Sequence, residues 1–210
     1  MGITKIKKRD SIIVVDIGSK LTLIDVSPKG RLRVNALESV GLSKEINQDF
    51  ALNYISSFIK ENNIRNKNVI LKLRLKSLFI KRIQLPAIPD SELPEAIKWK
   101  VKDEVSFDIS EAELGFSVIK KSTKDDGAKV VDLICVLAKE KEVRGQVLLL
   151  KQAGLNCLSA ELLPFGYARL VEKYFMQAQD ETLGVLHLAH DRCFIALYKN
   201  AKLSFYRELP

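Results

Sequence analysis

The stretch SIIVVDIGSKLTLIDV, residues 11–26, decides the fold because it joins two apolar runs through a short polar turn. Residues 12–15 are all β-branched, which is typical of a buried central strand rather than of a helix. Gly18-Ser19-Lys20 interrupts this run, and residues 21–26 resume it as a return strand. The remainder of the chain can be placed against this pair of strands.

The turn between the two strands allows two interpretations. A carboxylate at a strand end can hold a metal-bound water, and a tight turn presents backbone N–H groups, so Asp16-Ile17-Gly18-Ser19 could cradle a phosphate. The same pattern also occurs in plain hairpin corners that bind nothing.

The composition is that of an ordinary globular protein, with 47% hydrophobic and 29% charged residues among 210. No apolar run approaches the ~20 residues that a membrane-spanning helix requires. Residues 1–10 are basic but lack the apolar core and cleavage site of a signal peptide. The three cysteines are odd in number and widely spaced, which disfavours a disulfide framework and a zinc site. We therefore expect a cytosolic protein with reduced, mostly buried thiols at Cys135, Cys157 and Cys193.

The net charge of +8 is unevenly distributed. Residues 1–85 hold 17 Lys and Arg against 7 Asp and Glu, residues 86–153 hold 11 against 13, and residues 154–210 hold 6 against 6. The basic first segment could face anionic lipid or an acidic partner, or it could be a solvated strand face. Nucleic acid is disfavoured because no aromatic residues interleave with the basic ones. The basic residues concerned are Lys5, Lys7, Lys8, Arg9, Lys72, Arg74, Lys76, Lys81 and Arg82.

The first 85 residues follow the order of an α/β layer domain. A third strand at 31–40 follows a reverse turn, and apolar residues at helical spacing then predict a helix over residues 50–59. Alternating leucines predict a half-buried strand at 69–75, and another strand is expected at 78–85.

Prolines and a change to acidic composition predict that a second module begins at residue 86. A helix capped by Ser91 should bury every fourth residue from Leu93 to Val105. Trp99 lies off that stripe, and we expect core packing for it, with partner docking as the alternative. Two strands around the turn at Gly127 and a helix over residues 139–153 complete the module.

The last part of the chain repeats the opening pattern. After a strand at 155–162 and a helix from Pro164, three further strands are expected within residues 183–206. Two such three-stranded units separated by helices suggest a duplicated architecture with a ligand between the copies.

Several stretches resemble the PilM family of actin-like, FtsA-like type IV pilus assembly proteins. The most specific is IQLPAIPDSELPEAIKWKVKDEVSFDISEAELGFSVI, residues 83–119, which combines the Leu-Pro junction, the W-K-x-K-D-E helix and the S-F-D-I exit in order. The others are VVDIGS (14–19), LICVLAKEKEVRGQVLLLKQAGL (133–155), ELLPFGYARL (161–170) and LSFYREL (203–209).

The resemblance implies an α/β protein with an actin-like (ribonuclease H-like) subdomain 1A, an inserted FtsA-like subdomain 1C and the first strands of 2A. The expected boundaries are 1–85 for the first part of 1A, 86–153 for 1C, 154–182 for the return of 1A and 183–210 for the start of a truncated 2A. In the family, ATP and magnesium lie between 1A and 2A. The resemblance assigns the first phosphate turn to Asp16, Gly18 and Ser19, with Thr22 at the position of the family's usual lysine.

The second phosphate turn corresponds to His187-Leu188-Ala189, where the family has Asp-x-Gly. His187 cannot hold a magnesium-bound water as a carboxylate does, and Ala189 adopts a positive φ less readily than glycine. We expect ATP to bind weakly or not at all, and we predict no enzymatic activity. A metal site formed by His187, His190, Asp191 and Cys193 is disfavoured because residues three apart on a strand face opposite sides.

The function that the resemblance implies is that of a cytoplasmic scaffold peripheral to the inner membrane. Its partner would be the cytoplasmic tail of a PilN-type protein, held in a groove between 1A and 1C near Leu85-Pro86, and its basic residues would face an anionic leaflet. The alternatives are the cytoplasmic domain of a type II secretion L-type protein and, if the chain is a fragment, an ATP-hydrolysing PilM. Self-association through residues 183–206 is also expected, because an unpaired strand edge and an uncovered apolar face favour it.

Overall fold

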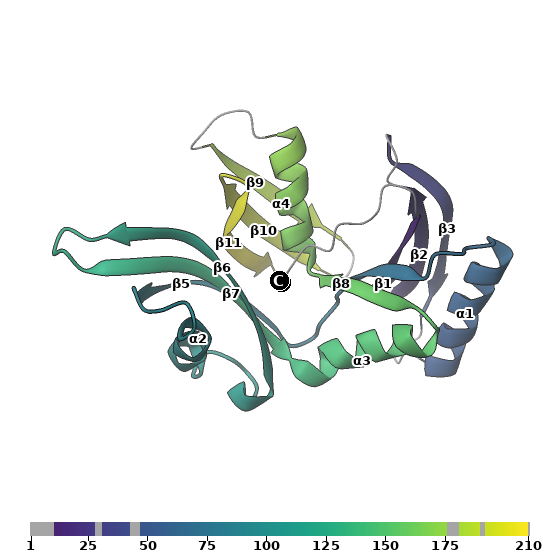
Figure 1. Ribbon diagram of the computed structural model, residues 1–210, viewed down its shortest axis with the longest axis horizontal. Coiled ribbons are helices and arrows are strands. Elements are labelled where there is room, and N and C mark those ends of the chain that lie inside the picture. The colour runs from purple at the N-terminus through teal and green to yellow at the C-terminus, as the bar shows by residue number, and fades with distance from the viewer. Residues whose placement is uncertain (1–10, 28–30, 43–46, 176–180, 190–191, 210) are drawn as a thin grey trace. The chain divides into compact units, whose positions relative to one another are not determined.

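The computed structural model describes residues 11–27, 31–42, 47–175, 181–189 and 192–209 (Figure 1). These residues form three β-sheets and divide into two compact units, each described below by itself. Unit 1 comprises Met1–Arg74 and Arg144–Leu163, and unit 2 comprises Leu75–Val143 and Pro164–Pro210. Within the described residues, no helix is both long and apolar enough to cross a bilayer.

Unit 1 is built on a five-stranded sheet with the order β3-β2-β1-β4-β8. β1, β2 and β3 pair antiparallel, and β4 and β8 continue the sheet in parallel. The first hairpin and the third strand are therefore confirmed. The strands are β1 (Ile12–Ile17), β2 (Lys20–Ser27), β3 (Arg33–Gly41), β4 (Asn68–Lys72) and β8 (Asn156–Glu161).

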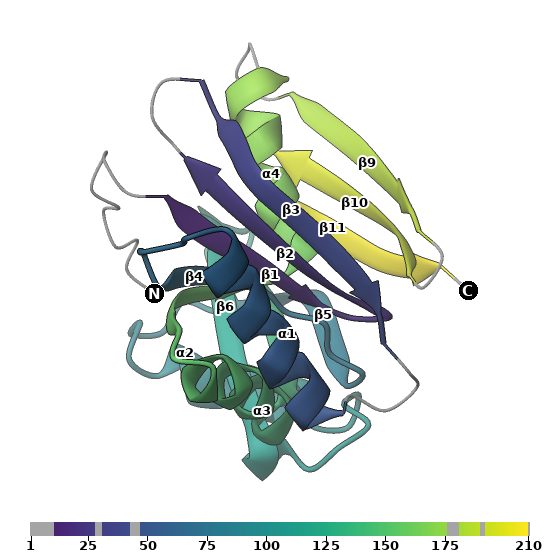
Figure 2. The ribbon, with the colours of Figure 1, turned by 90° about the vertical axis from the view of Figure 1, so that its right-hand side faces the viewer.

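Helices α1 (Gln48–Glu61) and α3 (Glu140–Gln152) contribute to the core on one face of this sheet (Figure 2). The face is set by strand alternation, since every second residue of β1 is fully buried. The Asn47 side chain caps α1 by accepting a hydrogen bond of 3.1 Å from the Phe50 N–H. The principal members of the core are Ile13, Val15, Ile17, Leu21, Leu23, Ile55, Phe58, Val69, Leu71 and Leu150.

Unit 2 begins with a three-stranded antiparallel sheet in the order β5-β7-β6. Its strands are β5 (Leu78–Pro86), β6 (Ala112–Thr123) and β7 (Lys129–Lys139). Helix α2 (Leu93–Val101) packs on the sheet (Figure 1), and a short 3₁₀ helix, Ile109–Glu111, precedes β6. The shared core consists of Ile83, Leu85, Leu93, Ile97, Val101, Val131, Leu133, Cys135 and Leu137.

The boundary between the compact units lies after Arg74, whereas the composition placed a boundary after residue 85. β5 pairs along its whole length with β7, so residues 78–86 belong to the second sheet. In the same way, α3 was expected in the inserted module, but its Leu149 and Leu150 are buried in the core of unit 1. The change from basic to acidic composition after residue 85 therefore does not mark the point at which the strands begin to pair in the second sheet.

Trp99 is exposed over 71% of its surface, so the expectation that it packs in the core is wrong. Leu93, Ile97 and Val101 occupy the buried stripe of α2, and a residue two positions from Ile97 points away from that stripe. The Lys102 ammonium lies 4.1 Å from the centroid of the indole ring. The cap is also different, because Glu92 precedes the helix and makes no side-chain capping bond.

The last sheet of unit 2 consists of β9 (Thr182–Leu188), β10 (Cys193–Lys199) and β11 (Lys202–Leu209) in the order β11-β10-β9. Helix α4 (Leu163–Tyr174) contacts it, and the Tyr198 hydroxyl donates a hydrogen bond of 2.7 Å to the Pro164 carbonyl. Burial raises the pKa of Tyr198 above its ordinary value. Leu186 and Leu188 project from β9 and are exposed over 58% and 70% of their surfaces.

The three cysteines are free, but only Cys135 is buried. Burial raises the pKa of its thiol to about 11, so this thiol remains protonated at neutral pH. Cys157 and Cys193 are half-buried, which corrects the expectation of mostly buried thiols.

We predict that Ile97→Ala lowers the free energy of unfolding by about 2–5 kcal/mol, because it leaves a cavity in a fully buried site. Trp99→Ala, two residues away, should cost about 0.5–1 kcal/mol, which is the size of an exposed cation–π contact. Urea denaturation followed by circular dichroism measures both values. An equal loss of unfolding free energy in the two variants would contradict the burial of Ile97 and the exposure of Trp99.

We also predict that replacing Leu186 and Leu188 together by serine reduces concentration-dependent self-association of the chain, because their exposed side chains favour it. Sedimentation velocity over a range of concentrations measures the effect. Leu37→Ser is the control, since Leu37 is exposed over 60% of its surface but lies in unit 1. Unchanged association in the double variant would refute the expectation.

Candidate functional site

The first candidate turn is a tight connection between β1 and β2. The Gly18 N–H donates a hydrogen bond of 2.9 Å to the Lys20 carbonyl, and the Leu42 N–H donates one of 2.9 Å to the Ser19 carbonyl. The Gly18 N–H is therefore committed within the turn and does not point freely at a ligand.

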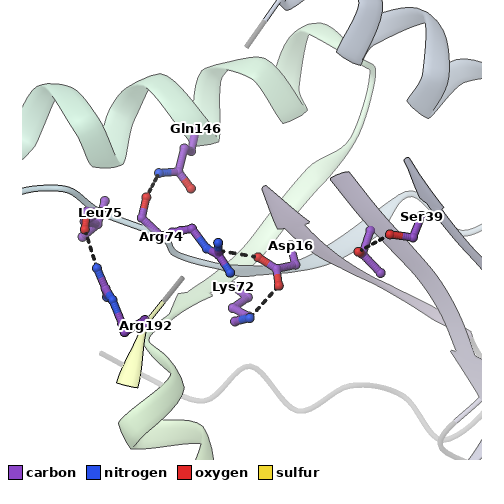
Figure 3. Close-up of polar contacts among 8 residues, drawn as sticks. Asp16, Ser39, Lys72, Arg74, Leu75, Gln146 and Arg192 are labelled. Atoms are coloured by element: carbon purple, nitrogen blue, oxygen red, sulfur yellow. Dashed lines mark hydrogen bonds and ion pairs between the residues drawn. The ribbon is translucent and has the colours of Figure 1, made fainter. Parts of the chain in front are cut away.

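Asp16, at the end of β1, lies between two cations (Figure 3). In the parallel pairing of β1 with β4, Asp16 stands directly beside Lys72. The Lys72 Nζ is 2.5 Å from Oδ2 of Asp16, and the Arg74 Nε is 4.0 Å from Oδ1. The side chains of Asp16, Lys72 and Arg74 are 25%, 31% and 28% exposed, so the cluster is shielded but still reached by solvent.

Arg74 also covers Gly18. A Cβ built on Gly18 would lie 2.3 Å from the guanidinium carbon of Arg74, so the guanidinium fills the space beside the turn. The backbone around Arg74 is fixed by two hydrogen bonds. Gln146 Nε2 donates one of 2.8 Å to the Arg74 carbonyl, and the Leu73 N–H donates one of 2.7 Å to the Glu161 carbonyl.

Thr22 lies opposite Asp16 in the hairpin, but its side chain is engaged elsewhere. Its hydroxyl is 3.0 Å from the Ser39 hydroxyl on β3, at hydrogen-bond distance (Figure 3). The structure thus brings Asp16, Gly18 and Ser19 together, with Thr22 directed at the neighbouring strand.

The residues of this turn do not fit a magnesium–phosphate group in the arrangement that they adopt. The carboxylate that would hold a magnesium-bound water already accepts from an ammonium group, and the surface of Gly18 lies under a guanidinium. A divalent cation would be repelled by two positive charges within a few ångströms. Magnesium could enter only if both cations moved away from Asp16.

The second candidate turn lies in unit 2, where His187 belongs to an aromatic cluster. Its Nδ1 is 3.0 Å from the Tyr167 hydroxyl, and its ring stacks on Phe194 with centroids 4.7 Å apart. Ala189 is half-buried, and its carbonyl accepts a hydrogen bond of 3.4 Å from the Cys193 thiol. These contacts give His187 a packing role on the sheet.

A metal site at this turn was disfavoured from the sequence, and two of its four residues, His190 and Asp191, lie outside the described residues. Across the described ranges, no group of three or more His, Cys, Asp or Glu side chains could hold a metal ion.

The pairing of Asp16 with Lys72 and Arg74 was not predicted from the sequence. A signal was present, because the alternation that buries Leu71 and Val15 places Lys72 and Asp16 on the other face of the same sheet. Two further basic residues are also paired, since Lys81 contacts Glu104 and the Arg82 Nη2 lies 3.4 Å from Oδ2 of Asp132.

These ion pairs involve several of the basic residues for which a lipid surface, an acidic partner or a solvated face was considered. Lys72, Arg74, Lys81 and Arg82 each have a carboxylate partner within the chain. The backbone N–H of Lys76 donates to Glu142, and the basic residues within 1–10 lie outside the described residues.

Comparison with known proteins gives a family model and two similar solved structures. A family model described as type IV pilus assembly protein PilM matches residues 14–210. A chain of a PilM–PilN type IV pilus biogenesis complex superposes with a TM-score of 0.78 at 24% identity, covering 96% of this chain and 62% of that one. The chain thus spans less than two thirds of the length of that relative.

The second structure is the cytoplasmic domain of EpsL, an inner-membrane component of the type II secretion system of Vibrio cholerae. It matches with a TM-score of 0.62 at 16% identity, covering 95% of this chain and 71% of that one. No curated protein matches the sequence. The structural likeness confirms the expected α/β, actin-like fold class.

We predict that titration calorimetry with ATP and magnesium detects no binding tighter than millimolar, because the Asp16 carboxylate is already paired with Lys72 and the Arg74 guanidinium covers Gly18. Micromolar binding that disappears in Asp16→Ala would show instead that the first turn suffices for nucleotide.

Proposed function

We propose that this chain, which belongs to the type IV pilus assembly protein PilM family, is a non-enzymatic scaffold of pilus assembly. Its partner is the cytoplasmic N-terminal tail of a PilN-type inner-membrane protein. The scaffold lies in the cytoplasm and is held at the inner membrane through this tail rather than by insertion into lipid.

The observation that carries the proposal is the family match, which runs from β1 to β11 without leaving out either unit. The likeness to a chain of a PilM–PilN complex supports the choice of partner, because that protein is known in complex with PilN. At 24% identity the structural likeness shows that the fold is shared, and the partner of this chain is our proposal.

The edge of β5 is one of the strand edges of unit 2 to which an extended peptide could add. β5 is the outermost strand of its sheet on one side, and an edge strand presents backbone N–H and C=O groups to which a further strand can be added. The strand ends at Leu85-Pro86, the junction that carries the family resemblance. Backbone hydrogen bonds would supply affinity there, and apolar anchors of the tail would supply specificity.

The ion pairs of β5 favour an apolar contact over a charge-driven one. Lys81 and Arg82 are already paired with Glu104 and Asp132, so they offer little net charge to a peptide. An acidic tail would therefore gain little from this strand. We assign the tail's affinity to one or two buried apolar side chains, each contributing about 25 cal/mol per Å² of apolar area removed from water.

The alternative function is that of the cytoplasmic domain of a type II secretion L-type protein. The likeness to EpsL favours it, but with a lower TM-score and lower identity than the likeness to the pilus complex. The two functions differ in the partner tail, so a comparison of the two peptides distinguishes them.

We predict that a fluorescently labelled N-terminal peptide of the PilN-type protein encoded beside this chain binds with a dissociation constant in the micromolar range. Fluorescence anisotropy measures the affinity, with a scrambled peptide as the control and the corresponding tail from a type II secretion system as competitor. No binding at hundreds of micromolar to the folded protein would overturn the proposal.

Hydrogen exchange measured on the same complex locates the bound peptide. Amides of β5, Leu78–Pro86, should become protected, whereas those of β6, Ala112–Thr123, on the opposite edge of the same sheet should not. Equal protection of both edges would show that the tail does not add to β5.

A further inference from the structure

The cluster around Asp16 contains two cations for one carboxylate, at the place that the family resemblance assigns to magnesium and phosphate. Both cations come from the segment that follows β1 in the sheet, since Lys72 ends β4 and Arg74 lies two residues beyond it. The Arg74 guanidinium lies over Gly18, and Figure 3 shows it directed at Asp16.

We propose that Lys72 and Arg74 take the place of the metal at this turn, so that the turn is closed by the chain's own cations and needs no nucleotide to be stable. The inference rests on the assignment of residues 16–19 as the family's first phosphate turn, and it is independent of which tail the protein binds. In this proposal, Asp16, Lys72 and Arg74 form a structural ion cluster that holds the turn closed.

Backbone pairing fixes the position of the first cation. In a parallel sheet, neighbouring residues in register project their side chains on the same face, and Asp16 is paired with Lys72 in this way. Lys72 thus meets the carboxylate because of the strand register, and its Nζ–Oδ2 distance of 2.5 Å is that of a charge-assisted hydrogen bond.

The backbone that carries the second cation is held by a helix and by another strand of the same sheet. Gln146 on α3 holds the Arg74 carbonyl, and Glu161 at the end of β8 holds the N–H of Leu73. Two consecutive elements that lie far from residues 72–74 in the sequence therefore position this short segment. Such support is what a structural contact needs and what a mobile surface arginine lacks.

The carboxylate itself depends on these cations. The Oδ1 atom of Asp16 is buried and accepts no hydrogen bond from any residue that the structure describes, so its nearest compensation is the Arg74 Nε at 4.0 Å. A shielded carboxylate is unfavourable unless a positive charge accompanies it. In an open nucleotide site that charge would come from magnesium, and here it comes from the chain.

The two possibilities predict opposite signs for one substitution. In a site that awaits a metal, the metal-free carboxylate has no counterion, so Asp16→Asn leaves the melting temperature unchanged or raises it. In a closed turn the same substitution removes the negative charge that accompanies Lys72 and Arg74. The melting temperature should then fall by about 2–4 °C, the usual response of a chain of this size to a loss of one ion-pair interaction.

The experiment measures thermal unfolding of the whole chain with and without millimolar MgADP. Asp90→Asn is the matched control, because Asp90 pairs with Lys121 at 3.1 Å but is 77% exposed, and it should shift the melting temperature by less than about 1 °C. MgADP should not raise the melting temperature of the unsubstituted protein.

A double-mutant cycle excludes a merely local structural effect of the asparagine. Lys72→Met alone should lower the melting temperature, and combining it with Asp16→Asn should lower it by less than the sum of the two shifts. Additive shifts, a rise in Asp16→Asn, or stabilisation of the unsubstituted protein by MgADP would each overturn the proposal. Asp16→Asn should still bind the PilN-type peptide, so a failure of peptide binding by the unsubstituted chain speaks only against the proposed function.

Discussion

The parallel pairing of β1 with β4 is the constraint on which the described structure of unit 1 depends, because it cannot form without a crossover. A hairpin can join antiparallel strands, but parallel strands need a longer connection, usually a helix. Here the connection from β1 to β4 runs through β2, β3 and α1. Helix α1 buries Phe58 and Ile55 against the same face of the sheet that carries Val15. The pairing thus fixes the helix, the core and the register at once.

The same pairing decides the chemistry of the opposite face. Once Val15 and Leu71 are buried on one side, Asp16 and Lys72 must share the other. A carboxylate that could have waited for a ligand therefore stands beside an ammonium group. In our proposal, the turn that most resembles a phosphate site in the sequence is closed by the chain's own cations.

A similar arrangement occurs in unit 2, where Asp132 is buried and lies near two cations. Its Oδ2 is 3.4 Å from the Arg82 Nη2 and 3.7 Å from the Lys120 Nζ. Burial of a carboxylate requires such partners, because the cost of removing its charge from water is otherwise large. A part of the basic character of the chain thus neutralises its own carboxylates.

The sequence by itself determined the elements, whereas the tertiary structure decided how they are grouped. Strand alternation and helical spacing depend on near neighbours, so the opening hairpin, α1 and the strands from β5 to β11 were predictable, as was the turn at Gly127 with its positive φ of 80°. The family resemblance added the fold class. Local alternation and helical spacing also give the face on which Trp99, Asp16 and Lys72 lie. Which sheet receives residues 78–86, whether another element covers Trp99, and which side chain lies beside Asp16 depend on contacts between segments far apart in the chain.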